Sequence, residues 1–280
     1  MRHLRFGALD LFFLSDGTMR LDGGSMFGVV PRVMWEKLAP PDPQNRIPLA
    51  LNCLLIRSGT THVLCDTGVG DKDDAAFHER FALDRGPGLL AGLAEIGLGP
   101  EDVDVVVSSH LHFDHTGGST RRDGDRLVPT FPNARHVIQA RHLEEAGRAN
   151  ERVRRSYHEE SYLPLQEAGV VEKVDGDAEI APGVRVHLTP GHCSFHQSVI
   201  FASGDRAGIF LGDVVPTAAH APLAYAMAFD VDPVETVETR RRLYREALHH
   251  RWLLCLDHET RFPCGYLERQ GSTYRIVAAE

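Results

Sequence analysis

Four side chains of the kinds that bind metal ions lie within six residues of one another, in the segment His-Leu-His-Phe-Asp-His at 110–115. The segment 104–109, with its β-branched run of three valines, precedes them and predicts a short strand. In an extended chain, alternate side chains point to the same side, so His110 and His112 can bind one ion. Asp114 and His115 follow where the chain turns, and they can face a second ion nearby. Imidazole together with carboxylate suits zinc and related divalent metals.

Three more residues of ligand type stand on the loops that follow predicted strands. His192 follows Pro190-Gly191, Asp213 follows Gly212, and His258 follows an apolar run. A single such residue is typical of a solvated loop, but α/β sites are commonly built on loops at strand ends. With the first cluster they make seven candidate ligands, which is a set that two ions need.

The remaining pattern indicates the elements that position these loops. Apolar and β-branched runs predict strands at 9–14, 49–57, 61–66, 104–109, 134–139, 184–188, 197–202, 208–211 and 252–256. Helical spacing or charge alternation predicts helices at 89–96, 141–149, 150–158 and 233–250. Strands in both halves with helices between them predict a layered α/β or α+β sandwich. Residues 17–48 are rich in glycine and proline but carry many large apolar groups, which favours an ordered excursion over a linker.

Composition narrows the classes of partner. The 280 residues carry a formal net charge of −9, which argues against nucleic acid and against an anionic membrane surface, since both need a basic face. We find no apolar stretch that approaches the roughly 18 residues of a membrane span, and no signal peptide at the N-terminus. Five scattered cysteines without a CxxC pair indicate reduced thiols. We therefore expect a cytoplasmic protein with a small-molecule substrate.

The motifs resemble those of the metallo-β-lactamase superfamily, in order and with fitting gaps from about residue 48 to residue 260. The residues that carry the resemblance are His110-Leu111-His112-Phe113-Asp114-His115, Pro190-Gly191-His192, Gly212-Asp213, His258, and the strand 61–68 with its ending Asp66-Thr67-Gly68. The resemblance implies an α+β fold, an αββα sandwich of two mixed β-sheets flanked by helices. We expect residues 1–280 to form one such domain, with 17–48 shaping a cleft or a dimer contact.

The same resemblance implies a role for each ligand. His110, His112 and His192 would hold the first metal, and Asp114, His115 and His258 the second. Asp213 would bridge the two metals, and Asp66 would orient a ligand histidine. Zinc is the expected metal, with manganese, cobalt and iron as alternatives. Cys193 follows a ligand directly, so contact with the metal and simple packing are both open.

Departures from other branches point to one group within the superfamily. An aspartate at position 213 disfavours true β-lactamases, and histidine at 112 disfavours the flavodiiron proteins, which carry glutamate there. The nuclease branches add a domain and a basic surface, and glyoxalase II relatives add a C-terminal helical region, whereas only 22 residues follow His258 here. The stretches 22–31 and 228–233 resemble the lactonase and methyl parathion hydrolase-like branch.

These observations together predict a binuclear metal-dependent hydrolase. Two cations that share a water lower its pKa from about 15.7 to about 7, and the resulting bridging hydroxide would cleave a lactone, a related carboxylic ester or a phosphotriester. Asp114 is the candidate catalytic residue, which orients the nucleophile or carries a proton. The expected apolar cleft lining is Met26, Phe27, Trp35, Tyr225 and Phe229, with core or dimer packing as the other interpretation. The alternatives are a mononuclear-iron sulfur dioxygenase, a glyoxalase II-like thioesterase and a regulatory member of the fold.

Overall fold

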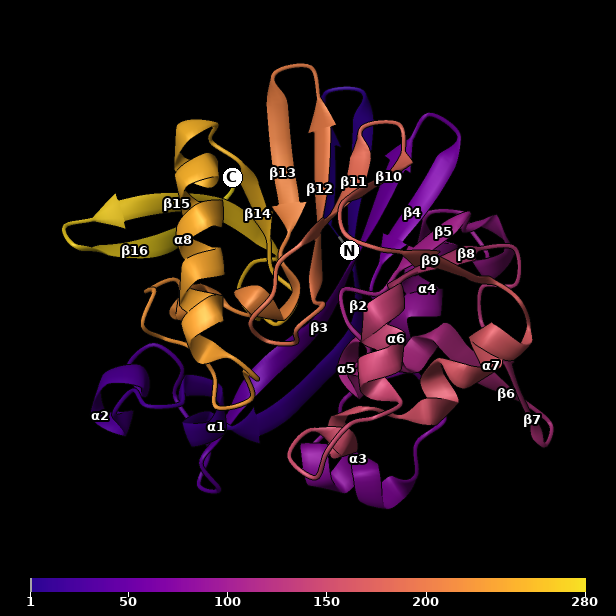
Figure 1. Cartoon of the computed structure of the whole chain (residues 1–280), viewed down its shortest axis with the longest axis horizontal. Coiled ribbons are helices and arrows are strands. Elements are labelled where there is room, and N and C mark those ends of the chain that lie inside the picture. The colour runs from indigo at the N-terminus through magenta and orange to yellow at the C-terminus, as the bar shows by residue number, and fades with distance from the viewer. Residues whose placement is uncertain (1) are drawn as a thin grey trace.

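Two seven-stranded β-sheets pack face to face in the computed structural model, which describes residues 2–280 (Figure 1). The first sheet has the order β1-β2-β3-β4-β5-β8-β9 and the second the order β10 to β16 in sequence. The strands of the first sheet are β1 (Arg2–Phe6), β2 (Leu9–Asp22), β3 (Arg46–Ser58), β4 (Thr61–Cys65), β5 (Val105–Val107), β8 (Arg135–Gln139) and β9 (Val171–Val174). Those of the second sheet are β10 (Ala178–Ala181), β11 (Val184–Leu188), β12 (Gln197–Ser203), β13 (Arg206–Phe210), β14 (Leu253–Cys255), β15 (Cys264–Gln270) and β16 (Thr273–Ala278). A separate ribbon pairs β6 (Thr120–Asp123) with β7 (Arg126–Pro129).

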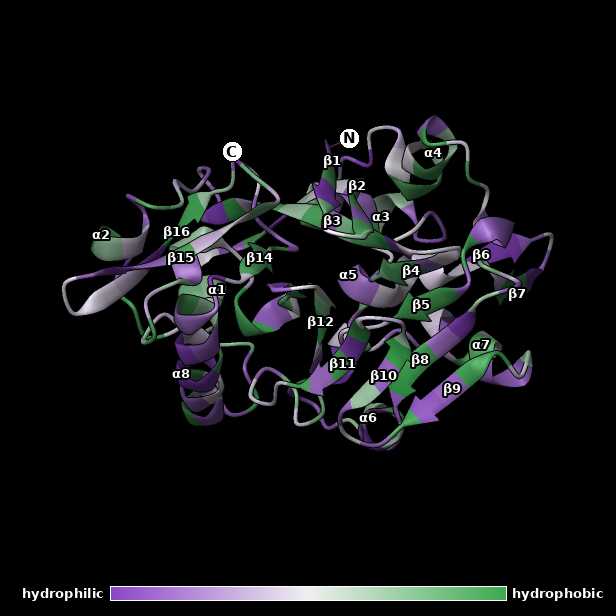
Figure 2. Cartoon of the chain, turned by 90° about the horizontal axis from the view of Figure 1, so that it is seen from above, coloured by the Kyte–Doolittle hydropathy of each residue, from purple (hydrophilic) through white to green (hydrophobic). Residues whose placement is uncertain are grey.

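Helices pack on the outer faces of both sheets and along the edge between them. They are α1 (Gly23–Phe27), α2 (Arg32–Trp35), α3 (Ala75–Phe81), α4 (Gly88–Glu95), α5 (Phe113–Thr116), α6 (Ala140–Ala146), α7 (Leu163–Glu167) and α8 (Pro233–His249). Figure 2 shows α8 against the second sheet, and α4 packs on the first. Both sheets are mixed, since β4, β5, β8 and β9 run parallel, as do β13 and β14, among antiparallel neighbours. The predicted αββα sandwich is therefore confirmed.

Alternation along the strands explains the layers. In β5, Val105 and Val107 face the core between the sheets, whereas Val106 faces the core beneath α4. All three are fully buried, and burial of each such side chain stabilises the fold by about 1.5–3 kcal/mol. Both halves of the chain contribute to the core between the sheets, and on this ground we propose that residues 1–280 form one domain. No helix within residues 2–280 combines the length and the apolar character that a membrane crossing needs.

The structure corrects several predicted elements. Strand β2 does not end at Leu14 but continues past a bulge to Asp22 and pairs with β3, so part of the 17–48 excursion is sheet. The predicted helix at 150–158 is wrong: this segment forms turns and a short 3-10 helix, and the predicted helix at 141–149 is confined to α6. The reason is tertiary, because Tyr157 is buried and forms a β-bridge with His112. No strand was predicted at β1, β6, β7, β9, β10, β15 or β16.

Candidate metal centre

Strand direction brings the predicted ligands to one edge of the sandwich. In the second sheet, β11 and β13 each pair antiparallel with β12, and β13 runs parallel to β14, so the carboxyl ends of these three strands lie at the same edge. His192, Asp213 and His258 follow those ends. In the first sheet, the loop after β5 and helix α5 carry the ligands of 110–115 to the same place. All seven predicted residues are buried and meet there.

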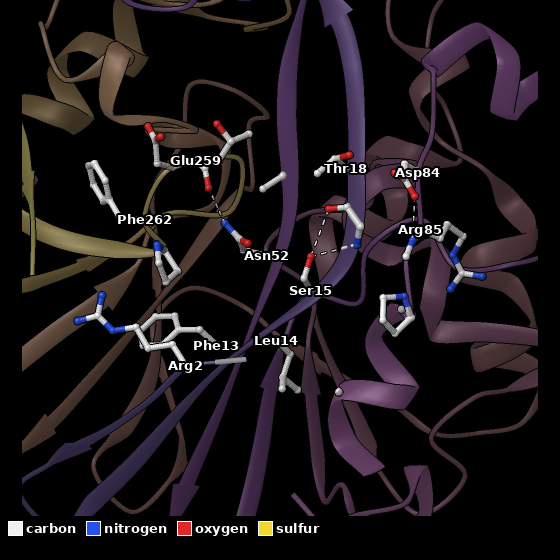
Figure 3. A pocket seen from close by; sticks show the side chains of 18 of the residues that line it. Arg2, Phe13, Leu14, Ser15, Thr18, Asn52, Asp84, Arg85, Glu259 and Phe262 are labelled. Atoms are coloured by element: carbon white, nitrogen blue, oxygen red, sulfur yellow. Dashed lines mark hydrogen bonds between the residues drawn. The ribbon is translucent and has the colours of Figure 1, made fainter. Parts of the chain in front are cut away.

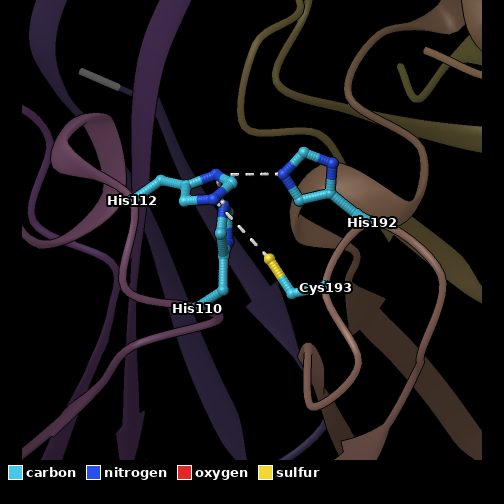
Figure 4. A group of neighbouring side chains, drawn as sticks. All are labelled: His110, His112, His192 and Cys193. Carbon is cyan, nitrogen blue, oxygen red and sulfur yellow. Dashed lines mark hydrogen bonds between the residues drawn. The ribbon is translucent and has the colours of Figure 1, made fainter. Parts of the chain in front are cut away.

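The first set joins three imidazoles. Nε2 of His110 lies 2.9 Å from Nδ1 of His112, which in turn lies 3.1 Å from Nε2 of His192 (Figure 4). Three ring nitrogens that converge in this way need a proton or a cation between them. Ligands at about 2.0–2.1 Å from a tetrahedral zinc are about 3.3 Å apart, which is close to these separations. His110 and His112 thus lie together, as alternate residues of an extended segment were expected to do.

The second set joins two imidazoles with carboxylates. Oδ2 of Asp114 lies 3.8 Å from Nε2 of His115 and 3.6 Å from Nε2 of His258. Asp213 touches both sets, with Oδ2 at 3.2 Å from Nε2 of His192 and Oδ1 at 3.2 Å from Nε2 of His258. The position of Asp213 between the sets is the one expected of a bridging carboxylate.

Protein partners hold the ring nitrogens that face away from this centre. Nδ1 of His115 lies 2.8 Å from Oδ2 of Asp66, and Nδ1 of His192 lies 3.0 Å from Oδ1 of Asp230. His258 donates from Nδ1 to the carbonyl of Ala50 in β3 at 2.7 Å. Such contacts fix the tautomer that leaves Nε2 free for a metal.

Several buried atoms at the centre have no hydrogen-bond partner in residues 2–280. They include Nε2 of His115 and Oδ1 of Asp213. A buried polar atom without a partner lowers the stability of the fold. A divalent ion can bind both an imidazole nitrogen and a carboxylate oxygen. The residues present therefore fit two divalent metal ions.

The charges around the centre agree with that fit. Burial, joined by repulsion from neighbouring imidazoles, holds the pKa of His110 and of His112 well below the ordinary value. Burial acts in the same direction on His115, but the carboxylates of Asp114 and Asp213 outweigh it and hold the pKa of His115 well above the ordinary value. A divalent ion replaces such protons when it binds, so metal binding should release protons here.

Close backbone packing shapes the loop that carries the second set. A Cβ added to Gly117 would lie 1.9 Å from the carbonyl oxygen of Val69, so only glycine fits. At Gly212, which has φ +58, an added Cβ would lie 2.6 Å from Nε2 of the buried His196. These glycines let the ligand loops pass close to neighbouring chain segments.

Three residues at the centre were missed or left open by the sequence. Asp230 lies in a segment that was noted without a role, and its partner His192 is 38 residues away. Asp257 is buried beside His258 and groups with His115, Asp213 and His258 as a set with metal-binding separations. The Sγ of Cys193 lies 3.7 Å from Nε2 of His112, the ring nitrogen that does not face His110 and His192.

An apolar cleft of about 390 Å³ opens onto the centre. Its floor includes Asp114 and Asp213, and its apolar walls are Leu21, Met26, Phe81, Phe113, Met227 and Phe229. The predicted lining by Met26 and Phe229 is confirmed. Phe27 and Trp35 do not line the cleft, because they stack on each other in the core behind it, and Tyr225 packs edge-on against Phe27.

A second hollow, of about 510 Å³, lies elsewhere along β2 and β3 (Figure 3). Two of its arginines have carboxylate partners, since Arg85 pairs with Asp16 and Arg261 with Glu259. Neither of the two metal-binding groups found in residues 2–280 lies in its lining. The cleft over the ligand sets is therefore the candidate site.

Comparison with known proteins agrees with this geometry. The family model described as "Metallo-beta-lactamase superfamily" matches residues 46–258. An N-acyl homoserine lactonase of Bacillus cereus is 28% identical over 211 residues, which are 72% of this chain and 73% of the relative. A solved structure of a probable metal-dependent hydrolase from Staphylococcus aureus has a TM-score of 0.91 at 25% identity, with 99% of each chain covered.

A second solved structure, the dizinc quorum-quenching lactonase AidC, has a TM-score of 0.84 at 18% identity and covers 100% of this chain and 97% of its own. At that identity the likeness speaks for the fold. The matched model spans the strand 61–65, both ligand sets and all seven candidate ligands. The chain belongs to the metallo-β-lactamase superfamily.

Proposed function

We propose that this chain is a binuclear metal-dependent hydrolase that opens the ring ester of a lactone with an apolar acyl tail. One observation carries the proposal: two ligand sets share Asp213 on the floor of an apolar cleft. The cleft volume lies within the range of small-molecule sites. Its apolar walls suit the aliphatic chain of a substrate, while Asp22, Arg152 and Arg155 also line the cleft.

His110, His112 and His192 would hold the first metal, and Asp114, His115 and His258 the second, with Asp213 common to both. Two such ions supply Lewis acidity and lower the pKa of a shared water towards neutrality. We propose zinc for both positions, because imidazole and carboxylate ligands suit it. The identity of the metal remains a prediction.

The chain's own side chains contribute orientation and a proton path. Oδ2 of Asp114 borders the cleft and lies between His115 and His258, from which it can orient the attacking water and pass a proton to the leaving alkoxide. Met26 and Met227 on the walls exclude water from the acyl tail. Neither serine nor cysteine is needed as a nucleophile.

The relatives support this substrate class. The Bacillus cereus relative is named an N-acyl homoserine lactonase, and the AidC structure contains the product N-hexanoyl-L-homoserine. A phosphotriester or an aryl ester would enter the same cleft and stays a secondary expectation. Cytoplasmic residence and a homodimer also remain predictions.

A substrate panel tests the proposal. Chain loaded with zinc, manganese or cobalt would be given acyl-homoserine lactones of increasing tail length, aryl esters, phosphotriesters and a glutathione thioester. We expect ring opening of the lactones, which is measured through the proton that the product acid releases. The value of kcat/KM should be highest for a lactone with an acyl tail. Turnover of the thioester alone, or of no ester on the panel, would contradict the assignment.

A further inference from the structure

Asp257 is a buried carboxylate without a hydrogen-bond partner in residues 2–280. Its side chain is 2% exposed, and neither Oδ1 nor Oδ2 accepts a hydrogen bond. An isolated buried carboxylate is strongly unfavourable unless a cation or donors compensate it. The seven ligands assigned above do not include it, so its place in the molecule requires another explanation.

The backbone holds Asp257 firmly at this spot. The N–H of Asn52 in β3 donates to the carbonyl of Asp257 at 2.8 Å, and the N–H of Ala50 donates to the carbonyl of His258 at 3.1 Å. The amide of Asn52 also donates to the carbonyl of Glu259 at 2.9 Å (Figure 3). The backbone of the loop that carries Asp257 is thus held against β3 at three successive residues.

Its surroundings are the second ligand set. Oδ2 of Asp257 lies 3.7 Å from Nε2 of His258, and it lies 3.9 Å from Nδ1 of His115, the ring nitrogen that faces away from the centre. Ligand atoms of His115, Asp213, Asp257 and His258 all lie within 4.8 Å of one another. Asp257 does not serve as the orienting partner of His115, because Asp66 already occupies Nδ1 at 2.8 Å.

We propose that Asp257 is an additional carboxylate of the second metal position and acts directly on the cation there. This inference rests on the proposed two-metal site and not on the lactone substrate. The second position then has three carboxylates, of Asp114, Asp213 and Asp257, beside two imidazoles, whereas the first has three imidazoles and Asp213. Carboxylates suit harder cations such as Mn²⁺, so the second position should tolerate Mn²⁺ better than the first does.

The test compares two carboxylates that flank His258. Asp257→Asn removes the charge and keeps the shape. Glu259→Gln is the matched control, because Glu259 is also buried but both its oxygens have partners, in Arg261 and the N–H of Ala218. Each full-length variant would be stripped with a chelator and equilibrated with buffered Co²⁺ or Mn²⁺. Bound metal is then measured by elemental analysis, and unfolding of the metal-free chain by circular dichroism.

The two variants should behave in opposite ways. Asp257→Asn should weaken binding of the second ion by roughly 10–100-fold, with the first ion retained and the Tm of the metal-free chain unchanged or raised. Glu259→Gln should lower the metal-free Tm and leave both metal affinities within about twofold. The Co²⁺ d–d absorption should change in Asp257→Asn and not in Glu259→Gln.

Several results would overturn the inference. Wild-type metal affinity and an unchanged Co²⁺ spectrum in Asp257→Asn would remove Asp257 from the site. A lower metal-free Tm, or failure of the metal-free variant to fold, would show a structural role instead. A carboxylate that makes no hydrogen bond in the metal-free chain should not destabilise that chain when it is replaced by an amide. If the wild-type chain binds only one ion, the two-metal site itself fails, which distinguishes that failure from an error about Asp257.

Discussion

Replacement of Asp66 by asparagine should invert the tautomer of a ligand histidine. Oδ1 of Asp66 accepts the backbone N–H of Ser109 at 2.7 Å, and Oδ2 faces Nδ1 of His115 at 2.8 Å. A backbone N–H can only donate, so the asparagine oxygen must take that side. The asparagine NH₂ then faces Nδ1 of His115 and donates to it. The ring proton moves to Nε2, which is the nitrogen that should hold the metal.

The size of the effect follows from this geometry. Loss of a group that orients a ligand histidine typically costs 10–100-fold in metal affinity, or about 1.4–2.7 kcal/mol. For Asp66→Asn, the loss of affinity for the second ion should lie in the upper part of that range. Asp66→Ala should cost less, because the ring of His115 can then choose either tautomer. Backbone conformation does not favour alanine, since Asp66 has φ +56 and asparagine adopts this region more readily.

The assay is competition for the second ion against a coloured chelator, with chain from which metal has been removed. We expect the order wild type, Asp66→Ala, Asp66→Asn from tight to weak binding. Affinity for the first ion should stay the same in all three. An Asp66→Asn variant that binds the second ion as well as Asp66→Ala, or better, would refute the tautomer argument.

Two further predictions address other parts of the molecule. At the first position, Oδ2 of Asp230 accepts the N–H of Met227 while Oδ1 faces Nδ1 of His192. Asp230→Asn should therefore lower the affinity for the first ion by roughly 10–100-fold in the same titration. Loss of affinity for the second ion alone would contradict this. In β8, burial lowers the pKa of His136 to about 4, and neither ring nitrogen has a partner in the described chain. The unfolded chain takes up this proton near pH 6.5 and the folded chain near pH 4, so stability present above pH 6.5 should fall by about 3 kcal/mol as the pH drops through that window. Urea unfolding of the chelator-treated chain measures this decrease in the free energy of unfolding. The decrease should be smaller in His136→Leu. An equal decrease in that variant would show that His136 is not its source.

The sequence was most informative where ligand types follow short apolar strands. His110, His112, Asp114 and His115 are neighbours in the chain, so their proximity needs only the extended segment that leads to them. His192, Asp213 and His258 were found because each follows a strand end, and parallel strands bring such ends to one edge. Local spacing and strand direction were therefore sufficient to predict that these seven residues lie close together.

Contacts between distant segments were not accessible in this way. Asp230 acts on a residue 38 positions away, and nothing in its own neighbourhood indicates that partner. For Asp257 a local signal existed, since it directly precedes a ligand in an apolar run, but its burial without a partner appears only in the structure. A side chain's type alone does not reveal which groups surround it.

Hydrophobic and charged patterns misled in two places. Phe27 and Trp35 have the types expected of a cleft wall, but they stack with an interplanar angle of 6° inside the core of the excursion. The charged segment 150–158 is typical of an exposed helix, yet Arg152 reaches across to the carbonyl of Ala228 and Tyr157 is buried. In both cases tertiary contacts outweigh local preference.

The count of metal ions per chain tests the central claim most directly. Elemental analysis of the chain, equilibrated with buffered Zn²⁺ and freed of excess, should give about two ions per chain, as a binuclear site requires. Because Asp213 touches both ligand sets, Asp213→Ala should lose metal and the rate of lactone opening together. A single ion per chain, or full metal content and full activity in Asp213→Ala, would contradict the account.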